Sequence, residues 1–260
     1  MKICRFKSNE SISFGIFEND LIYRIEGFPD VSNLSDQINN KEIFKITDIE
    51  ILPPIQPSKI VCVGRNYAEH ALELGNEVPK YPLIFLKAPS AIISNGEAIV
   101  IPILSQQVEH EGELGIVIGK PCKNLSQNDD PMEFVMGYIC LNDVTARDLQ
   151  RLDIQFTRAK SFDTFCPISN FVETALDISD IRVTTKVNNI IRQDGRTSQM
   201  VFSVPFLIRY ISNQMTLNEG DIIATGTPAG VSKLNPGDIC EVHIEGLDIL
   251  QNPIINMENL

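Results

Sequence analysis

Short apolar segments separated by turn residues recur along most of the chain. Three such segments, at residues 2–6, 13–17 and 21–25, read as strands, and residues 31–38 read as a helix. The proline-rich stretch ILPPIQPSK, at residues 51–59, then breaks the pattern. We therefore expect a small N-terminal α/β domain over residues 1–55 and a larger domain over residues 56–260.

Segments rich in Val, Ile and Thr dominate the larger part and predict strands. They lie at residues 59–64, 82–87, 97–102, 113–119, 134–143, 169–173, 182–188, 221–226 and 238–246. Helical patterns are few and lie at residues 66–74, 144–152 and 204–212. The pattern predicts an α+β protein, mainly β with a few helices, built as a rolled sheet or barrel.

Composition and charge narrow the range of partners. The 260 residues carry a formal net charge of −12, which argues against nucleic acid and anionic membranes as partners. The chain has no apolar run of the ~18 to 20 residues that cross a bilayer, and its first residues lack the apolar centre of a signal peptide. Six scattered cysteines without a C-x-x-C motif indicate a reduced, cytoplasmic protein.

Acidic residues occupy alternate positions just before an apolar run. Glu109, Glu111 and Glu113 would share one face of an extended strand, and Asp143 follows another apolar segment thirty residues later. The interpretation without a functional role is that the acids lie on a solvated strand face and that Asp143 caps the helix that follows it. The alternative is a site for a hard cation, because Mg²⁺ and Mn²⁺ are commonly held by a few carboxylate oxygens.

Several motifs, taken in order, resemble the fumarylacetoacetate hydrolase family. They are VGRNYAEHALELG (63–75), PLIFLKAPSAI (82–92), EGELGIVIG (111–119), LNDVTARD (141–148), AKSFDTFCP (159–167) and IIATGTPAGV (222–231). The resemblance covers roughly residues 57–255, and residues 1–50 resemble the small N-terminal domain of the shorter members. It implies the rolled mixed β-sheet of that family, a homodimer, and a metal centre.

The resemblance assigns roles to individual residues. The implied ligands of Mg²⁺ or Mn²⁺ are Glu111, Glu113 and Asp143, with Glu109 supporting them from outside. The implied catalytic residues are His70, Glu73 and Lys160. The implied substrate-binding residues are Arg65, Lys87, Gln150, Asp163 and Thr227.

Lys160 would neutralise charge that develops on the substrate, and Asp163 would orient it. Without the resemblance, Lys160 and Lys87 would read as surface lysines and Thr227 as part of an ordinary turn. Arg147 reads equally well as a site residue or as a structural ion-pair partner.

His70 and Glu73 are three residues apart, so on a helix they would lie on one side. A carboxylate there can orient an imidazole that acts as a general base for water. The alternative is an incidental His–Glu pair on a surface helix. The resemblance places this pair on a lid that closes over the substrate. His110 and His243 lie in strand patterns without such a partner, and we interpret them as structural.

The resemblance implies chemistry on a 2-oxo acid through a metal-stabilised enolate. We expect hydrolysis of a C–C bond in a 2,4-dioxo acid such as an acylpyruvate. The alternatives within the same chemistry are isomerisation of a 2-hydroxyhepta-2,4-diene-1,7-dioate, as in aromatic catabolism, and decarboxylation of oxaloacetate. A protein that binds metabolites without catalysis is the alternative of a different class.

Overall fold

The computed structural model describes residues 1–257, except for the side chains of residues 39–41. Its N-terminal unit contains β1 (Lys2–Ser8), β2 (Ser11–Glu18), β3 (Leu21–Ile25), α1 (Leu34–Gln37), β4 (Ile38–Lys45), the 3₁₀ turn η1 (Ile46–Asp48) and β5 (Glu50–Leu52). Asn9 and Glu10 turn the chain between β1 and β2, and Asn19 and Asp20 do so between β2 and β3. All four have positive φ, the geometry that tight two-residue hairpins need.

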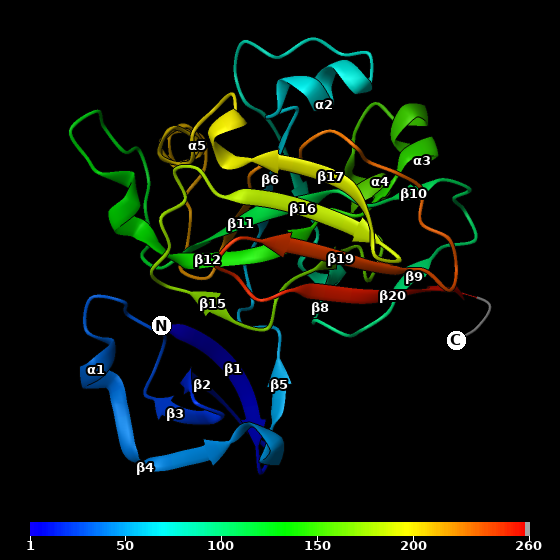
Figure 1. Cartoon of the computed structure of the whole chain (residues 1–260). Coiled ribbons are helices and arrows are strands. Elements are labelled where there is room, and N and C mark those ends of the chain that lie inside the picture. The colour runs from blue at the N-terminus through cyan, green and yellow to red at the C-terminus, as the bar shows by residue number, and fades with distance from the viewer. Residues whose placement is uncertain (258–260) are drawn as a thin grey trace.

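The N-terminal unit continues into the main sheet of the molecule. Strand β1 pairs with β15 (Val172–Glu173), with Ile3 opposite Val172. The strand order from the N-terminal unit into the main sheet is β4-β3-β2-β1-β15, and β5 also pairs with β1. In Figure 1 the N-terminal unit lies below the rest of the molecule, next to β15. The division of the chain at residue 55 stays a prediction.

The remaining strands complete this sheet and form a second one. After β15 the main sheet continues, in spatial order, with β12 (Val135–Asn142), β11 (Gly112–Ile118), β18 (Ile222–Ala224), β6 (Ile60–Gly64) and β7 (Leu83–Lys87). The second sheet contains, in spatial order, β17 (Ile190–Arg196), β16 (Arg182–Val187), β19 (Ile239–Ile244), β20 (Leu250–Asn256) and β9 (Ile99–Ile101). Two short pairs join β10 (Val108–Glu109) to β13 (Thr145–Ala146) and β8 (Ile92–Ile93) to β14 (Cys166–Pro167).

One of the large buried hydrophobic clusters lies between the two sheets. Every residue of β11 and β12 is buried, which explains why both strands are apolar without alternation. Leu114 and Ile116 of β11 belong to the same buried cluster as Val183 of β16 and Val242 of β19. Figure 1 shows β16 and β19 crossing in front of β11 and β12. Glu113 therefore lies on a fully covered strand, and Glu111 comes directly before that strand.

Helices cover the upper edge of the sheets in Figure 1. They are α2 (Ala68–Glu73), α3 (Arg147–Leu152), α4 (Thr157–Lys160) and α5 (Val204–Ser212), with 3₁₀ turns η2 (Pro89–Ala91), η3 (Pro131–Phe134) and η4 (Thr197–Gln199). The predicted fold, mainly β with a few helices, is confirmed. The predicted helices at 66–74, 144–152 and 204–212 correspond to α2, α3 and α5, whereas the sequence pattern does not predict α4, β17 or β20.

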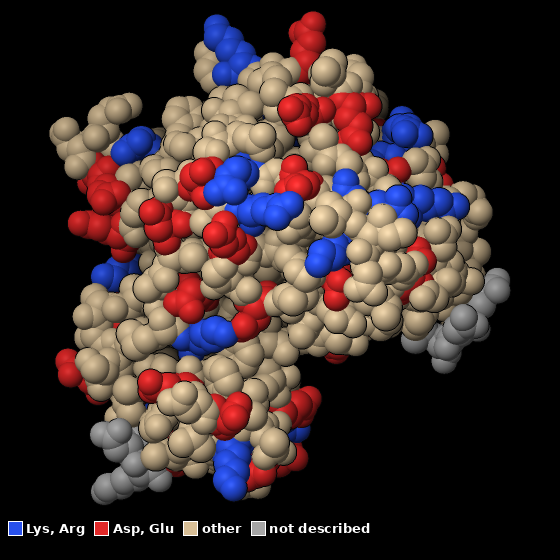
Figure 2. Space-filling model, in the orientation of Figure 1, with Lys and Arg blue, Asp and Glu red and all other residues tan. Residues whose placement is uncertain are grey.

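Charges of both signs are mixed over the face of the molecule drawn in Figure 2. Lys and Arg side chains stand singly or in small groups among Asp and Glu, without a continuous basic surface on that face. Within residues 1–257, no helix has both the length and the apolar character needed to cross a membrane.

Candidate metal centre and active site

Three carboxylates converge where β11 begins and β12 ends. Gly112 pairs with Asn142 across the two strands, which places Glu111 and Asp143 side by side, and the Asp143 N–H donates to the Glu111 carbonyl at 2.8 Å. Glu113 lies two residues further along β11. Ligand oxygens of Glu111, Glu113 and Asp143 all lie within 4.8 Å of one another, and the three side chains are buried. The wet-face interpretation of this strand is therefore wrong.

Two lysines reach this group from other elements. Lys160, the last residue of α4, donates to Glu111 Oε2 at 2.7 Å and to Asp143 Oδ2 at 2.6 Å. Lys87, the last residue of β7, donates to Asp143 Oδ1 at 2.7 Å. Neither lysine is a surface residue, since each is at most 2% exposed.

Arg147 links the remaining acid to the group. Its Nε donates to Glu109 Oε2 at 2.7 Å, its Nη2 donates to Glu111 Oε1, and its Nη1 donates to Gln150 Oε1 at 2.6 Å. Glu109 also accepts a hydrogen bond from Gln107 at 2.6 Å. Arg147 therefore holds both the carboxylate that supports the site and one of the predicted ligands.

The buried cluster contains more acidic side chains than basic ones. Its acids are Glu109, Glu111, Glu113 and Asp143, and its cations are Lys87, Arg147 and Lys160. Four carboxylates thus face three cations in a region that excludes water. Burial alone raises the pKa of Glu111, but Lys160 and Arg147 outweigh it and hold that pKa below its ordinary value. Burial, together with the charges of Asp143 and Glu111, raises the pKa of Glu113 well above its ordinary value.

Glu113 is therefore the carboxylate that most needs a cation. Its Oε2 accepts the Gly226 N–H at 2.7 Å, a contact made possible because Gly226 adopts a φ of +98°. Burial lowers the pKa of Lys160, but Asp143 and Glu111 reverse this and raise it, so Lys160 stays protonated. Oxygen donors without nitrogen or sulfur suit a hard divalent cation, and the residues present fit one.

A small cavity opens onto the three carboxylates. It holds about 60 Å³, and Glu111, Glu113, Asp143 and Lys160 form one wall. Leu74 and Asn76, beside α2, and the rings of Phe85 and Phe156 form much of the rest. The two rings meet edge to face, with centroids 5.5 Å apart, and the Lys160 ammonium lies 5.1 Å from the Phe85 centroid. Charged side chains and aromatic rings thus line the same small cavity.

His70 enters the cavity from α2. Its Nδ1 lies 3.4 Å from Glu73 Oε2, and Glu73 in turn accepts the Gly230 N–H at 3.1 Å. Burial lowers the pKa of His70, although the Glu111 charge opposes the shift, so the imidazole is neutral near pH 7. The contact with Glu73 assigns the proton to Nδ1 and leaves Nε2 as the basic nitrogen.

Comparison with known proteins agrees with this geometry. The model of the fumarylacetoacetate (FAA) hydrolase C-terminal domain matches residues 59–255, and a model described as Rv2993c-like, N-terminal, matches residues 1–54. The chain belongs to the fumarylacetoacetate hydrolase family. The family resemblance inferred from the motifs is therefore confirmed.

Named relatives of this family member act on 2-oxo acids or related compounds. A mitochondrial oxaloacetate decarboxylase of Dictyostelium discoideum is 46% identical over 73% of this chain and 90% of the relative. An oxaloacetate tautomerase of Bacillus subtilis is 39% identical over 82% of this chain and 75% of the relative. The structure of a 5-carboxymethyl-2-hydroxymuconate delta-isomerase from Mycobacterium smegmatis superposes with a TM-score of 0.87 at 38% identity, over 98% of this chain and 100% of that one.

The structure brings most of the predicted site residues of this family member to one cavity. Those that line it are Arg65, His70, Glu111, Glu113, Asp143, Gln150, Lys160 and Thr227. Glu73 and Lys87 lie behind this lining and contact His70 and Asp143, respectively. Arg65 has a φ of +58°, which is uncommon for a residue other than glycine.

Two of the predicted contacts differ from expectation. Asp163 is exposed and does not line the cavity, and the acids that hold Lys160 are Glu111 and Asp143. The reason is that α4 ends at Lys160, so the three-residue spacing to Asp163 is not a helical one. The Thr227 hydroxyl is already engaged, since it donates to the Gly112 carbonyl at 2.8 Å and accepts from Gln193 at 2.6 Å.

The amino-acid sequence gives no sign of the aromatic part of the cavity lining or of the Gly226 N–H that contacts Glu113. Phe85 lies in an apolar strand pattern that gives no sign of a cavity.

His110 is buried between Gln193 and Ser232, with its Nδ1 3.0 Å from Gln193 Oε1 and its Nε2 2.8 Å from Ser232 Oγ. Burial lowers the pKa of His110 to about 4, which keeps it neutral.

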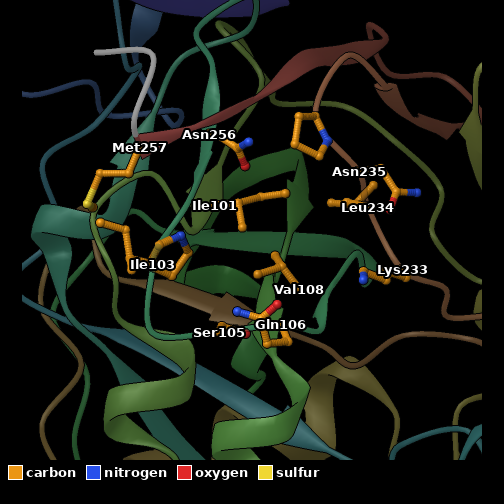
Figure 3. A pocket seen from close by; sticks show the side chains of 12 residues that line it. Ile101, Ile103, Ser105, Gln106, Val108, Lys233, Leu234, Asn235, Asn256 and Met257 are labelled. Carbon is orange, nitrogen blue, oxygen red and sulfur yellow. The ribbon is translucent and has the colours of Figure 1, made fainter.

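A second cavity, of about 310 Å³, lies apart from this site. Figure 3 shows its lining side chains, among them Ile101, Ile103 and Val108 on one side and Lys233, Leu234 and Asn235 on the other. None of the predicted site residues lines it. This cavity is larger than the first, but it is not the candidate active site. The acids and the histidine whose pKa values are shifted lie around the smaller cavity.

Proposed function

We propose that this protein catalyses proton transfer at C3 of a small 2-oxo dicarboxylic acid of the oxaloacetate type, which interconverts its enol and keto forms, with decarboxylation as a related reaction. The observation that carries the proposal is the small cavity in which neutral His70 and protonated Lys160 face the three carboxylates. Two named relatives, an oxaloacetate tautomerase and an oxaloacetate decarboxylase, support this reaction over hydrolysis of a C–C bond.

Glu111, Glu113 and Asp143 would hold the metal ion, which we propose to be Mg²⁺ or Mn²⁺. Bound there, it would polarise the 2-oxo group and make the C3 proton more acidic. It would also offset the excess negative charge of the cluster and so admit an anionic substrate.

The protein's own residues supply the proton chemistry. In the keto-to-enol direction His70 takes the proton from C3 through Nε2 and passes it to the oxygen at C2, and in the reverse direction it takes the O–H proton and delivers it to C3, because burial keeps the imidazole neutral. Glu73, fixed by the Gly230 N–H, orients the ring. Lys160 provides a permanent positive charge where the substrate oxygen becomes negative. Leu74, Phe85 and Phe156 exclude water.

The size of the cavity favours a compact substrate. The cavity holds about 60 Å³, whereas pockets for drug-sized ligands typically measure ~300 Å³ or more. It therefore suits a short substrate better than one with a long acyl chain. We propose that Arg65 and Gln150, which line the same cavity, contact the distal carboxylate of the substrate.

Hydrolysis of an acylpyruvate is the second candidate. The His70–Glu73 pair favours it, because an oriented neutral imidazole can equally activate water. Both candidate reactions need the same group of three carboxylates and Lys160. The two reactions are therefore distinguished by measuring which substrate the protein turns over. A protein that only binds a metabolite would show metal-dependent binding without turnover.

The test is a comparison of three substrates with the purified protein. Loss of the oxaloacetate enol, release of pyruvate from oxaloacetate and cleavage of acetylpyruvate should be followed with Mg²⁺ and again with a chelator. We expect the enol to be consumed fastest, and only with the metal. Faster cleavage of acetylpyruvate would favour the hydrolase, and no turnover of any substrate would favour the binding protein.

A further inference from the structure

Gln193 lies on β17 with its side chain completely buried, whereas its neighbours Arg192 and Asp194 are exposed. A buried amide needs partners for its carbonyl oxygen and for both of its N–H groups. All of the partners of Gln193 belong to two segments of the candidate site. They are the stretch that contains the E-x-E acids and the TGTP loop at residues 225–228.

Backbone groups fix the orientation of this amide. The Gly112 N–H can only donate, and it lies 3.0 Å from Gln193 Oε1. The Pro228 carbonyl can only accept, and it lies 2.7 Å from Gln193 Nε2. Gln193 Nε2 also donates to Thr227 Oγ1 at 2.6 Å. The assignment of oxygen and nitrogen follows from these partners and allows no flip.

The hydrogen bonds close a ring around Gly112. Gln193 accepts from the Gly112 N–H and donates to the Thr227 hydroxyl, which donates to the Gly112 carbonyl at 2.8 Å. Gly112 is the residue between Glu111 and Glu113. It must be glycine, because a Cβ there would lie 2.1 Å from Thr185 Oγ1. The ring therefore fixes the peptide that joins two of the proposed metal ligands.

The same ring also sets the position of the TGTP loop. Gly226, the residue before Thr227, donates its N–H to Glu113 Oε2 at 2.7 Å. A shift of the loop away from β11 would lengthen that contact and release the Glu113 carboxylate. Gln193 thus acts on Glu113 from two sides, through the backbone at Gly112 and through the loop at Gly226.

We infer that Gln193 is a positioning residue that holds Glu111 and Glu113 at the spacing a divalent cation requires. The inference rests on the proposed metal centre. Groups that orient metal ligands typically contribute ~10- to 100-fold to metal affinity. Gln193 touches neither the proposed ion nor the cavity, so its effect should appear in metal binding rather than in a direct substrate contact.

The test measures Mn²⁺ affinity by calorimetry or electron paramagnetic resonance, without substrate. Gln193→Glu keeps the shape of the side chain but removes the donor to Thr227 and Pro228, and Gln193→Met removes all of its polar contacts. Both should weaken Mn²⁺ binding by ~10- to 100-fold. Asn252→Leu is the matched control, because Asn252 is also a buried amide that donates to two backbone carbonyls, those of Ser94 and Glu97, outside the cavity.

Thermal unfolding of each variant separates positioning from general destabilisation. Asn252→Leu should lower the melting temperature and leave the Mn²⁺ affinity unchanged. If the Gln193 variants bind Mn²⁺ as the wild type does, the inference is overturned, whatever their stability. If the wild type itself fails to bind Mn²⁺, the proposed metal centre is overturned first and the inference with it.

A second pair of variants keeps the test decisive if the Gln193 variants fold poorly. Thr227→Val opens the same ring from the loop side and should also weaken Mn²⁺ binding. Thr227→Ser keeps the hydroxyl and should bind close to wild type. In the double variant Gln193→Glu/Thr227→Val, the losses should not add, because both changes break one ring. Equal Mn²⁺ affinity in Thr227→Val and Thr227→Ser would contradict the inference.

Discussion

The ammonium of Lys160 lies 2.6 Å from Asp143 Oδ2, although Lys160 belongs to α4 and Asp143 follows β12. This contact is completely buried. Lys160 also holds Glu111, so a single cation compensates two of the three proposed metal ligands. Glu113 is left as the carboxylate that the proposed metal ion would compensate.

Removal of Lys160 should destabilise the protein most when metal is absent. Lys160→Met leaves Glu111 and Asp143 buried with less compensation, which typically costs ~3–5 kcal/mol. We expect that loss in the free energy of unfolding in chelator and a smaller loss in excess Mg²⁺. The control is Lys2→Met, which breaks the partly exposed pair with Asp248 and should cost less than ~1 kcal/mol. Equal losses with and without Mg²⁺ would argue against a shared charge cluster.

Metal binding should stabilise the folded protein. At a Mg²⁺ concentration one hundred times its Kd, the free energy of unfolding should rise by ~2.7 kcal/mol, seen as a higher melting temperature. Glu113→Gln should remove most of this rise. Asp163→Asn, which changes an exposed carboxylate outside the cluster, should retain all of it. A full rise in Glu113→Gln would exclude Glu113 as a ligand.

The loss of His70 should affect catalysis and leave metal binding intact. General-base catalysis is typically worth ~10²- to 10⁴-fold, so His70→Ala should lower kcat for enol–keto conversion by that factor. Glu73→Gln should cause a smaller loss in the same direction, since Glu73 only orients the ring. Steady-state kinetics together with Mn²⁺ titration checks both points. Survival of kcat within about twofold would show that His70 is not the base.

The dependence of kcat/KM on pH should also report the protonation of His70. Burial places the pKa of His70 below its ordinary value, so the base is neutral until the pH falls below about 6.5. We expect kcat/KM to stay level above that pH and to decline below it as His70 becomes protonated. The residual activity of His70→Ala should lack this acidic limb. An unchanged limb in the variant would assign it to another group.

The homodimer stays a prediction. Ile103, Leu104, Leu152 and Ile154 are each more than 60% exposed, and a subunit interface would cover large apolar side chains of this kind. Light scattering at micromolar concentration should give twice the chain mass of 29.1 kDa. A mass near that of one chain would contradict the prediction.

The sequence predicts the fully buried strands well, and it singles out the three acids that the structure buries together. Strands β11 and β12 are continuous apolar runs, and the ordered motifs single out Glu111, Glu113 and Asp143. Strand β17 is the opposite case, because apolar Ile190 and Ile191 are exposed while polar Gln193 is buried. Its side chains follow the hydrogen bonds of the site rather than hydrophobicity, so no apolar pattern marks the strand or its glutamine.

Other features depend on tertiary contacts that a local pattern cannot contain. Strand β20 carries Pro253 opposite Ile239, and a proline argues against a strand when the sequence is read alone. Lys160 reads as a surface lysine because its burial depends on acids 17 and 49 residues away. Asp163 would be a plausible partner of Lys160 if the helix continued beyond Lys160, but α4 ends at that residue.

A crystal structure with Mn²⁺ and oxalate tests the central claim most directly. Oxalate resembles the 2-oxo acid end of the proposed substrate, and Mn²⁺ can be located by its anomalous scattering. We predict one anomalous peak, with oxygens of Glu111, Glu113 and Asp143 within ~2.5 Å of it and oxalate completing the coordination. A peak that lies elsewhere, or carboxylates that remain further than ~2.5 Å from the ion, would contradict the proposed metal centre.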